Sequence, residues 1–274
     1  MSKNAGAIGV FDSGVGGLSV VQQIVKELPR EDVLFFADTF HCPYGRRSHS
    51  EIQSLAREIV AFLLSAGAKV IVVACNTASA AALHYLREIF EVPIVGMEPA
   101  VKPAAERTGS KVVGVMATEA TFQGALFASL VERFASDVEV LTQTCPGLVE
   151  RVEAGFVQDA ETMEMLQRYL QPMMNQGIDS LVLGCTHYPH LRSLIEKITG
   201  DELEIIDPSP AVARQTARVL KREGLLREGK GGRCAFCTSG NPQLFARLLG
   251  ELTDLDGPVF EVTWEEGGTI ARSW

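Results

Sequence analysis

The sequence predicts a doubly wound α/β fold made of two similar lobes, with a ligand site in the cleft between them. Short β-branched runs alternate with helical patterns along most of the 274 residues, which indicates successive β-α-β units. The runs are continuously apolar, as expected for parallel strands buried on both faces. A sequence pattern also recurs after about 105–111 residues, a period well beyond that of solenoid repeats and close to the size of a domain.

The strands and helices follow one another in regular order. The expected strands are Ile8–Phe11, Val33–Ala37, Lys69–Ala74, Pro93–Met97, Lys111–Met116, Val138–Leu141, Ser180–Gly184 and Glu204–Ile206. The expected helices are Ser50–Ser65, Ser79–Phe90, Phe122–Phe134, Ala160–Gln176 and Pro189–Thr199. Glycines follow four of these segments, where a left-handed residue commonly ends a helix: Gly67, Gly109, Gly177 and Gly200. The basic stretch Lys221–Arg233 is expected to be a surface loop.

The repeat relates two units in which an apolar strand is followed by a cysteine. Cys75 in the first unit and Cys185 in the second are 110 residues apart. The matching segments are Ile8–Ser13 with Val113–Thr118, Val72–Thr77 with Leu181–His187, and Pro93–Val101 with Leu203–Val212. Because the repeat ends near Pro210, we expect the last part of the chain to return to the first lobe. The predicted lobes are therefore residues 1–98 with 211–274, and residues 99–210.

Composition excludes several classes of function. The net charge of −9 and the pI near 5.2 argue against general attraction to nucleic acid. No apolar run approaches the roughly 18 residues of a membrane span, and the N-terminus does not resemble a signal peptide. Six cysteines without framework spacing indicate reduced thiols in the cytoplasm.

The two repeated cysteines are the strongest functional signal. Ligands of open α/β sheets bind beyond the carboxyl ends of the strands, where both cysteines are expected to lie. A helix N-terminus after each cysteine would favour the thiolate and attract a carboxylate ligand. Buried free cysteine is more often a small apolar residue, but packing alone does not require cysteine at matching positions of both halves.

Two opposed thiols suit proton transfer at one carbon atom. One thiol would remove a proton from one face and the other would deliver a proton to the opposite face, which inverts the carbon. No lysine stands out as a Schiff-base partner of pyridoxal phosphate, and no metal-ligand spacing is evident. We therefore expect no cofactor and no metal, with hydrogen bonds stabilising the charge that develops on a substrate carboxylate.

Four motifs in order resemble the glutamate racemases, cofactor-independent enzymes of bacterial cell-wall synthesis in the aspartate/glutamate racemase family. They are Asp12-Ser13-Gly14-Val15-Gly16-Gly17-Leu18, Cys42-Pro43-Tyr44-Gly45, Ala74-Cys75-Asn76-Thr77-Ala78 and Gly184-Cys185-Thr186-His187-Tyr188-Pro189. The likeness extends from about residue 8 to about residue 210.

The resemblance implies a role for each matching residue. Cys75 would take the α-proton of D-glutamate with the assistance of Asp12. Cys185 would take the α-proton of L-glutamate with the assistance of His187. The residues implied to contact the substrate are Asp12, Ser13, Tyr44, Gly45, Asn76, Thr77, Thr186 and His187. Asp38, Glu153 and Thr118 are weaker candidates: the first two stand where the family often has acidic residues, and Thr118 is the repeat counterpart of Ser13.

Other interpretations of the same residues carry less weight. A dinucleotide loop at Gly14–Gly17 lacks the third glycine, since Ser19 occupies its position. A metal site of Cys185, His187 and His190 lacks a fourth ligand. The remaining cysteines, Cys42, Cys145, Cys234 and Cys237, and the tryptophans Trp264 and Trp274 are expected to serve in packing.

We therefore expect a cytoplasmic isomerase that interconverts L- and D-glutamate and supplies D-glutamate for peptidoglycan. Its partner would be the small substrate alone, and a homodimer is the default assembly of a soluble enzyme. The alternatives are a racemase of aspartate or another acidic amino acid, since one methylene is worth only ~1–3 kcal/mol in a pocket, and a non-catalytic amino-acid-binding protein.

Overall fold

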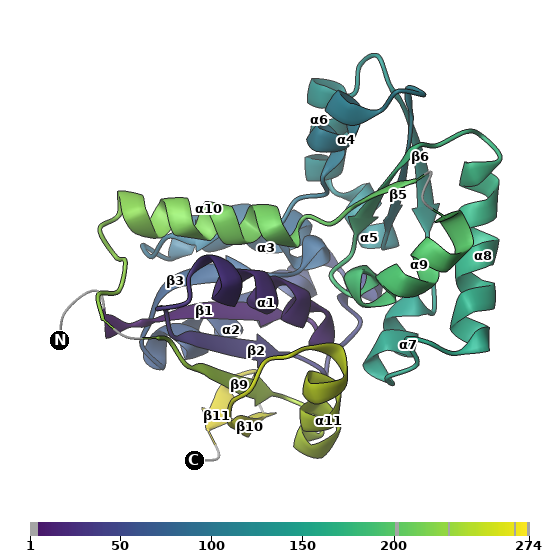
Figure 1. Ribbon diagram of the computed structural model, residues 1–274. Helices are drawn as coiled ribbons and strands as arrows, with labels where there is room; N and C mark the ends of the chain where they lie inside the picture. Colours follow the sequence, from purple (N-terminus) through teal and green to yellow (C-terminus); the bar gives the residue numbers. More distant parts are fainter. Residues whose placement is uncertain (1–4, 201–202, 230, 266, 273–274) are drawn as a thin grey trace.

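The computed structural model describes residues 5–200, 203–229, 231–265 and 267–272. It contains two α/β lobes side by side, each built on its own largely parallel sheet (Figure 1). The first and the last of the described strands both lie on the lobe drawn at the left of Figure 1. Among the described residues, no helix is long and apolar enough to cross a membrane. The predicted fold class, two parallel-sheet lobes, is confirmed.

The first lobe has a seven-stranded sheet in the order β11-β10-β9-β2-β1-β3-β4. All neighbouring strands are parallel except β10 and β11, which form an antiparallel pair. The strands are β1 Ala7–Asp12, β2 Val33–Ala37, β3 Ala68–Val73, β4 Ile94–Val95, β9 Cys234–Thr238, β10 Val259–Trp264 and β11 Ile270–Arg272. The helices of this lobe are α1 Leu18–Glu27, α2 His49–Ser65, α3 Asn76–Ile89, α10 Ser209–Arg222 and α11 Pro242–Leu252.

The second lobe has a four-stranded parallel sheet in the order β6-β5-β7-β8. Its strands are β5 Val112–Ala117, β6 Glu139–Thr144, β7 Ser180–Gly184 and β8 Glu204–Ile206. Its helices are α4 Val101–Arg107, α5 Glu119–Gln123, α6 Ala125–Phe134, α7 Leu148–Glu153, α8 Ala160–Met174 and α9 Arg192–Thr199. The order β6-β5-β7-β8 repeats the order β2-β1-β3-β4 of the first lobe, as an internal duplication predicts.

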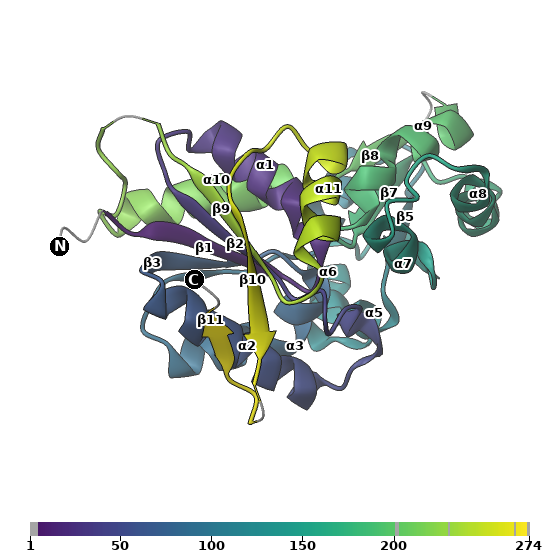
Figure 2. The same cartoon turned by 90° about the horizontal axis from the view of Figure 1, so that it is seen from below.

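The last part of the chain returns to the first lobe. After β8, helix α10 packs against α1, and strands β9 and β10 extend the sheet beyond β2 (Figure 2). We propose the lobe boundaries at residues 98 and 210, close to where the chain passes from one sheet to the other; the second falls just inside α10, which begins at Ser209.

Local sequence explains where the elements begin and end. Five of the six residues of β1 are buried, which accounts for its continuous apolar run. Helix α2 starts with a capping box, in which the Ser48 side chain accepts from the backbone N–H of Glu51 and the Glu51 carboxylate accepts from that of Ser48. The φ angles of Gly67, Gly177 and Gly200 are positive, as predicted.

Several predicted elements differ from those observed. The helix expected over Phe122–Phe134 is two helices, α5 and α6, that meet at the extended residue Gly124. Gly109 was expected to adopt a left-handed conformation, which is wrong: Lys111 has the positive φ instead, and the Gly109 N–H donates to Asp179. Helix α3 begins at Asn76, three residues before its predicted start, directly after Cys75.

Candidate active site

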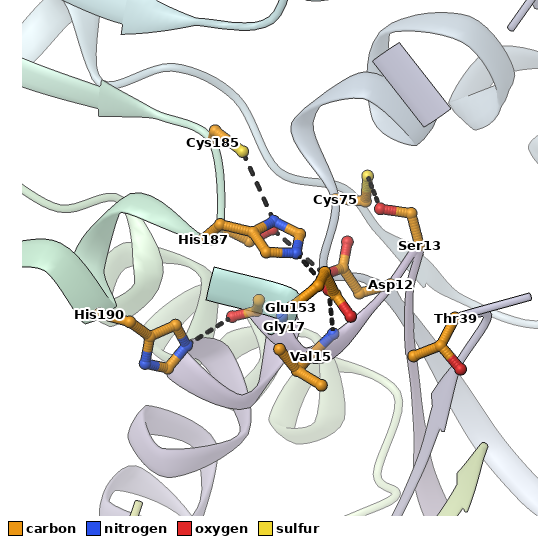
Figure 3. Close-up of polar contacts among 12 residues, drawn as sticks. Asp12, Ser13, Val15, Gly17, Thr39, Cys75, Glu153, Cys185, His187 and His190 are labelled. Atoms are coloured by element: carbon orange, nitrogen blue, oxygen red, sulfur yellow. Dashed lines mark hydrogen bonds and ion pairs between the residues drawn. The ribbon is translucent and has the colours of Figure 1, made fainter. Parts of the chain in front are cut away.

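A cavity between the lobes contains nearly all of the predicted site residues. Its lining comprises Ser13, Pro43, Tyr44, Gly45, Cys75, Asn76, Thr77, Thr118, Val149, Cys185, Thr186 and His187. Asp12 is the exception among the predicted residues, and it lies directly behind this lining (Figure 3). Both lobes therefore contribute to a single cavity at the carboxyl ends of their strands.

Cys75 lies at the end of β3 and caps α3. Its sulfur accepts a hydrogen bond from the Ala78 N–H at 3.4 Å and lies 3.8 Å from the Ser13 hydroxyl. We expected the helix end to favour the thiolate. Burial and the nearby Asp12 carboxyl outweigh that single bond, so that the pKa of the Cys75 thiol is well above its usual range. Near neutral pH Cys75 is therefore a protonated thiol in this structure.

Cys185 follows β7. The prediction that a helix begins directly after Cys185 is wrong. A 3₁₀ turn, Tyr188–Leu191, intervenes before α9 begins at Arg192. The neighbour of the Cys185 sulfur is the His187 ring, whose Nδ1 lies 3.6 Å away. The two thiols thus occupy equivalent places in the repeat but have different local partners.

Asp12 is fully buried at the end of β1 and connects the two lobes. Its Oδ2 accepts from the Gly17 N–H at 2.8 Å and from the Thr186 hydroxyl of the second lobe at 3.2 Å. Its other oxygen, Oδ1, is buried without a hydrogen-bond partner. Burial raises the pKa of the carboxyl, and the attraction of His187 opposes this rise only in part.

The raised pKa predicts that ionised Asp12 destabilises the fold. A carboxyl whose pKa is higher in the folded chain contributes stability at low pH, and that stability is lost as the pH rises through the folded pKa. Asp12→Asn, which cannot ionise, is expected to raise the free energy of unfolding near neutral pH by roughly 1 kcal/mol. Urea unfolding at several pH values measures this gain, which should shrink as the pH approaches about 4. A gain that is independent of pH would contradict the prediction.

Amide and hydroxyl groups from both lobes converge at the first turn of α3. The Asn76 side chain is buried, and neither its Oδ1 nor its Nδ2 has a partner. Thr77 Oγ1 lies 2.9 Å from Thr118 Oγ1 and 3.3 Å from Thr121 Oγ1 in the second lobe. Thr118 therefore lies at the cavity, as its place in the repeat indicated. Unsatisfied buried amide atoms are rare in folded proteins, so Asn76 indicates a polar ligand.

Glu153 and His187 form a hydrogen-bonded pair beside the cavity. His187 Nε2 lies 2.6 Å from Glu153 Oε1, which also accepts from the Val15 N–H of the first lobe at 2.8 Å. Although burial opposes protonation of the ring, the acceptor groups around His187 raise its pKa well above the usual value. Glu153, a weaker candidate from the sequence, is thus in direct contact with a predicted catalytic residue.

The glycines after Asp12 allow the lobes to approach closely. A Cβ atom at Gly14 would lie 1.9 Å from Glu153 Oε1, and one at Gly16 would lie 2.5 Å from His187 Nδ1. Gly14 and Gly16 are therefore needed where the first lobe contacts Glu153 and His187, a role that the sequence did not predict.

Tyr44 and Gly45 enter the cavity from a 3₁₀ turn, Tyr44–Arg46. The Tyr44 hydroxyl donates to Asp38 Oδ2 at 2.7 Å, and a Cβ at Gly45 would lie 3.0 Å from the Thr118 Cβ. Burial and the Asp38 carboxylate raise the pKa of Tyr44 well above its usual value, so Tyr44 acts as a neutral donor. Asp38 thus lies one hydrogen bond behind the cavity.

Cys42, which was expected to pack in a turn near the cleft, lies beside Glu153 and His187. Its sulfur, a Glu153 oxygen and a His187 nitrogen lie within 4.8 Å of one another, so these three residues offer ligand atoms of the kind that bind metals. Burial raises the pKa of Cys42 to about 12. His190, weighed above as a metal ligand, instead lies with Nε2 3.2 Å from the carbonyl oxygen of Gly16.

The chain is similar to known racemases over most of its length. Residues 8–216 match the model of the Asp/Glu/Hydantoin racemase family. A glutamate racemase of Stutzerimonas stutzeri is 50% identical over 250 residues, which cover 91% of this chain and 94% of that protein.

Solved structures show the same likeness. A glutamate racemase isoform from Bacillus anthracis superposes with a TM-score of 0.84 at 33% identity, covering 93% of this chain and 97% of that one. The glutamate racemase of Escherichia coli, in complex with L-glutamate and the activator UDP-MurNAc-ala, superposes with a TM-score of 0.83 at 30% identity, covering 97% and 99%. The chain therefore belongs to the Asp/Glu/Hydantoin racemase family, in which it groups with the glutamate racemases.

Proposed function

We propose that this protein is a glutamate racemase that interconverts L- and D-glutamate by proton transfer between two cysteines, without a cofactor. The observation that supports this most directly is that Cys75 and Cys185, at equivalent positions of the two lobes, line one cavity. The unsatisfied amide of Asn76 in the same lining indicates that the cavity is built for a polar ligand.

The proposed reaction breaks the Cα–H bond of the substrate on one face and forms a new one on the other. With D-glutamate, the Cys75 thiolate takes the α-proton and the Cys185 thiol donates a proton to the opposite face; with L-glutamate the roles are reversed. The electron pair of the broken bond is delocalised into the α-carboxylate, where hydrogen-bond donors of the cavity stabilise it.

Asp12 and His187 are proposed to adjust the protonation of the two thiols. Asp12 lies close enough to Cys75 for the two groups to influence each other's pKa, and its raised pKa suits a group that can take the thiol proton and return it. His187 Nδ1 lies 3.6 Å from the Cys185 sulfur, while Glu153 orients the ring through Nε2. Each thiol thus has its own assisting group, which is an aspartate for Cys75 and a histidine for Cys185.

The remaining lining residues are proposed to bind the charged groups of glutamate. Hydroxyl and amide side chains with backbone N–H groups can bind two carboxylates and one ammonium without a net positive site. The residues concerned are Ser13, Tyr44, Gly45, Asn76, Thr77, Thr118 and Thr186. The L-glutamate complex of the Escherichia coli enzyme, which shares this fold, agrees with that class of ligand.

We also propose the cellular setting. Cys42, Cys75, Cys145, Cys185 and Cys234 are free thiols, which supports a reducing compartment such as the cytoplasm. D-glutamate made there would enter peptidoglycan synthesis. A homodimer without nucleic-acid or membrane partners remains our expectation for the assembly.

An assay of the purified protein in D₂O tests the reaction. L-glutamate should lose its circular dichroism without added pyridoxal phosphate or metal, and each D-glutamate formed should carry deuterium at Cα. Retention of the original hydrogen would exclude the two-base scheme. L-aspartate, assayed in parallel, should turn over much more slowly; the reverse preference would identify an aspartate racemase, and inactivity with both would favour a binding protein.

A further inference from the structure

We propose that Trp264, from the C-terminal strand β10, is a positioning residue of the substrate cavity that acts through Asp38 on Tyr44. The inference rests on the proposed function, because it concerns how that cavity binds its substrate. Strand β10 lies beyond residues 8–216, the part of the chain that matches the family model.

Asp38 connects the C-terminal strands with the cavity. It follows β2 directly, and its side chain is fully buried. Oδ1 accepts from the Ser239 hydroxyl at 2.7 Å and from the Trp264 indole N–H at 2.8 Å. Oδ2 accepts from the Tyr44 hydroxyl at 2.7 Å. One oxygen thus binds the C-terminal segment while the other binds a residue of the cavity lining.

The rotation of the Asp38 carboxylate therefore depends on Trp264 and Ser239, together with His41, whose Nδ1 lies 3.1 Å from Oδ1 and 3.0 Å from Oδ2. A carboxylate has two oxygens in one plane, so donors on Oδ1 determine where Oδ2 points. Because the group is buried, no bulk water can replace a lost donor, and the Tyr44 hydroxyl follows the position of its acceptor. The Tyr44 ring is itself buried against the site and has little freedom to compensate.

The same C-terminal residues shape the segment that leads to Tyr44. The Trp264 ring packs edge-on against His41, with 4.9 Å between ring centroids, and His41 Nδ1 lies 3.0 Å from Asp38 Oδ2. The Phe40 N–H donates to the Ser239 hydroxyl at 3.1 Å. Trp264 thus contacts both the carboxylate and the loop between β2 and Tyr44, although 226 residues separate it from Asp38.

Steady-state kinetics of Trp264→Phe test the inference. Phenylalanine retains an aromatic ring beside His41 but lacks the indole N–H. We expect KM for glutamate to rise roughly tenfold while kcat stays within about twofold, because a displaced Tyr44 weakens substrate binding. Ser239→Ala, which removes the other donor to Oδ1, should shift KM in the same direction.

A double-mutant cycle separates this role from simple packing. Tyr44→Phe should raise KM at least as much as Trp264→Phe, and the double variant should match Tyr44→Phe alone, because Asp38 then has no hydroxyl to position. Thr269→Ala, which removes an exposed hydrogen bond to Glu265 near the same strands, is the control and should leave KM unchanged.

Two results would overturn the inference. An unchanged KM in both Trp264→Phe and Ser239→Ala would show that neither donor affects the cavity. Effects of Trp264→Phe and Tyr44→Phe that simply multiply would show that the two residues act independently. If the wild-type protein does not racemise glutamate at all, the proposed function fails first and the inference with it.

Discussion

Replacing Cys75 or Cys185 with serine is expected to lower kcat for glutamate racemisation by roughly 10²–10⁴-fold in both directions. Each variant retains the shape of the cavity but replaces a thiol with a hydroxyl that ionises far less readily. Because the two enantiomers have equal free energies in solution, kcat/KM must fall by the same factor for L- and D-glutamate, whichever cysteine is replaced.

Circular dichroism measures the loss, and calorimetry should show that both variants still bind glutamate. Cys234→Ser is a suitable control, since this half-buried thiol lies at the start of β9, away from the cavity lining. It should retain activity within about twofold. Full activity in either Cys75→Ser or Cys185→Ser would disprove the two-base scheme.

Gly16→Ala is expected to produce the second largest effect, a loss of at least roughly a hundredfold in kcat/KM. The added methyl would lie 2.5 Å from His187 Nδ1 and 2.7 Å from Thr186 Oγ1. Since contacts under 3 Å are not tolerated, His187 and Thr186 must move away from the first lobe. That shift would separate His187 from Cys185 and Thr186 from Asp12.

Gly250→Ala is the matched control for this substitution. Gly250 lies within helix α11, and apart from its chain neighbours and the backbone of its own helix no atom lies within 4 Å of where its Cβ would be. Alanine there should leave kinetics unchanged and raise the free energy of unfolding by roughly 0.5–1 kcal/mol. Gly16→Ala with normal kcat/KM would show that the lobes can separate slightly without loss of function.

Local patterns predicted strands β1 to β8, most of which are buried on both faces, but they missed β9, β10 and β11. Ser180–Gly184 and Glu204–Ile206 match the observed strands residue for residue. The repeat also predicted that Cys75 and Cys185 follow corresponding strands, because a duplicated unit places the same position at the same edge of its sheet.

Local sequence patterns did not predict the contacts between segments that lie far apart in the chain. The expectation of a helix end at Cys185 came from analogy with Cys75, but a 3₁₀ turn separates Cys185 from α9. Glu153 contacts the N–H of Val15, 138 residues away, and Trp264 contacts Asp38 across 226 residues. Trp264 was expected only to pack. The residues around a tryptophan in the sequence do not show which distant carboxylate its indole N–H will bind. Trp274 lies outside the described residues.

Three hydrogen bonds between the lobes have a consequence for turnover. Thr186 binds Asp12, Glu153 accepts from Val15, and Thr77 lies 2.9 Å from Thr118, so every one of these bonds joins a site residue to the opposite lobe. A rotation wide enough to admit or release glutamate would break them together. Closure would then restore the surroundings of Asp12, Glu153 and Thr77 in a single step, so that the two thiols would have their assisting groups only while the lobes are together.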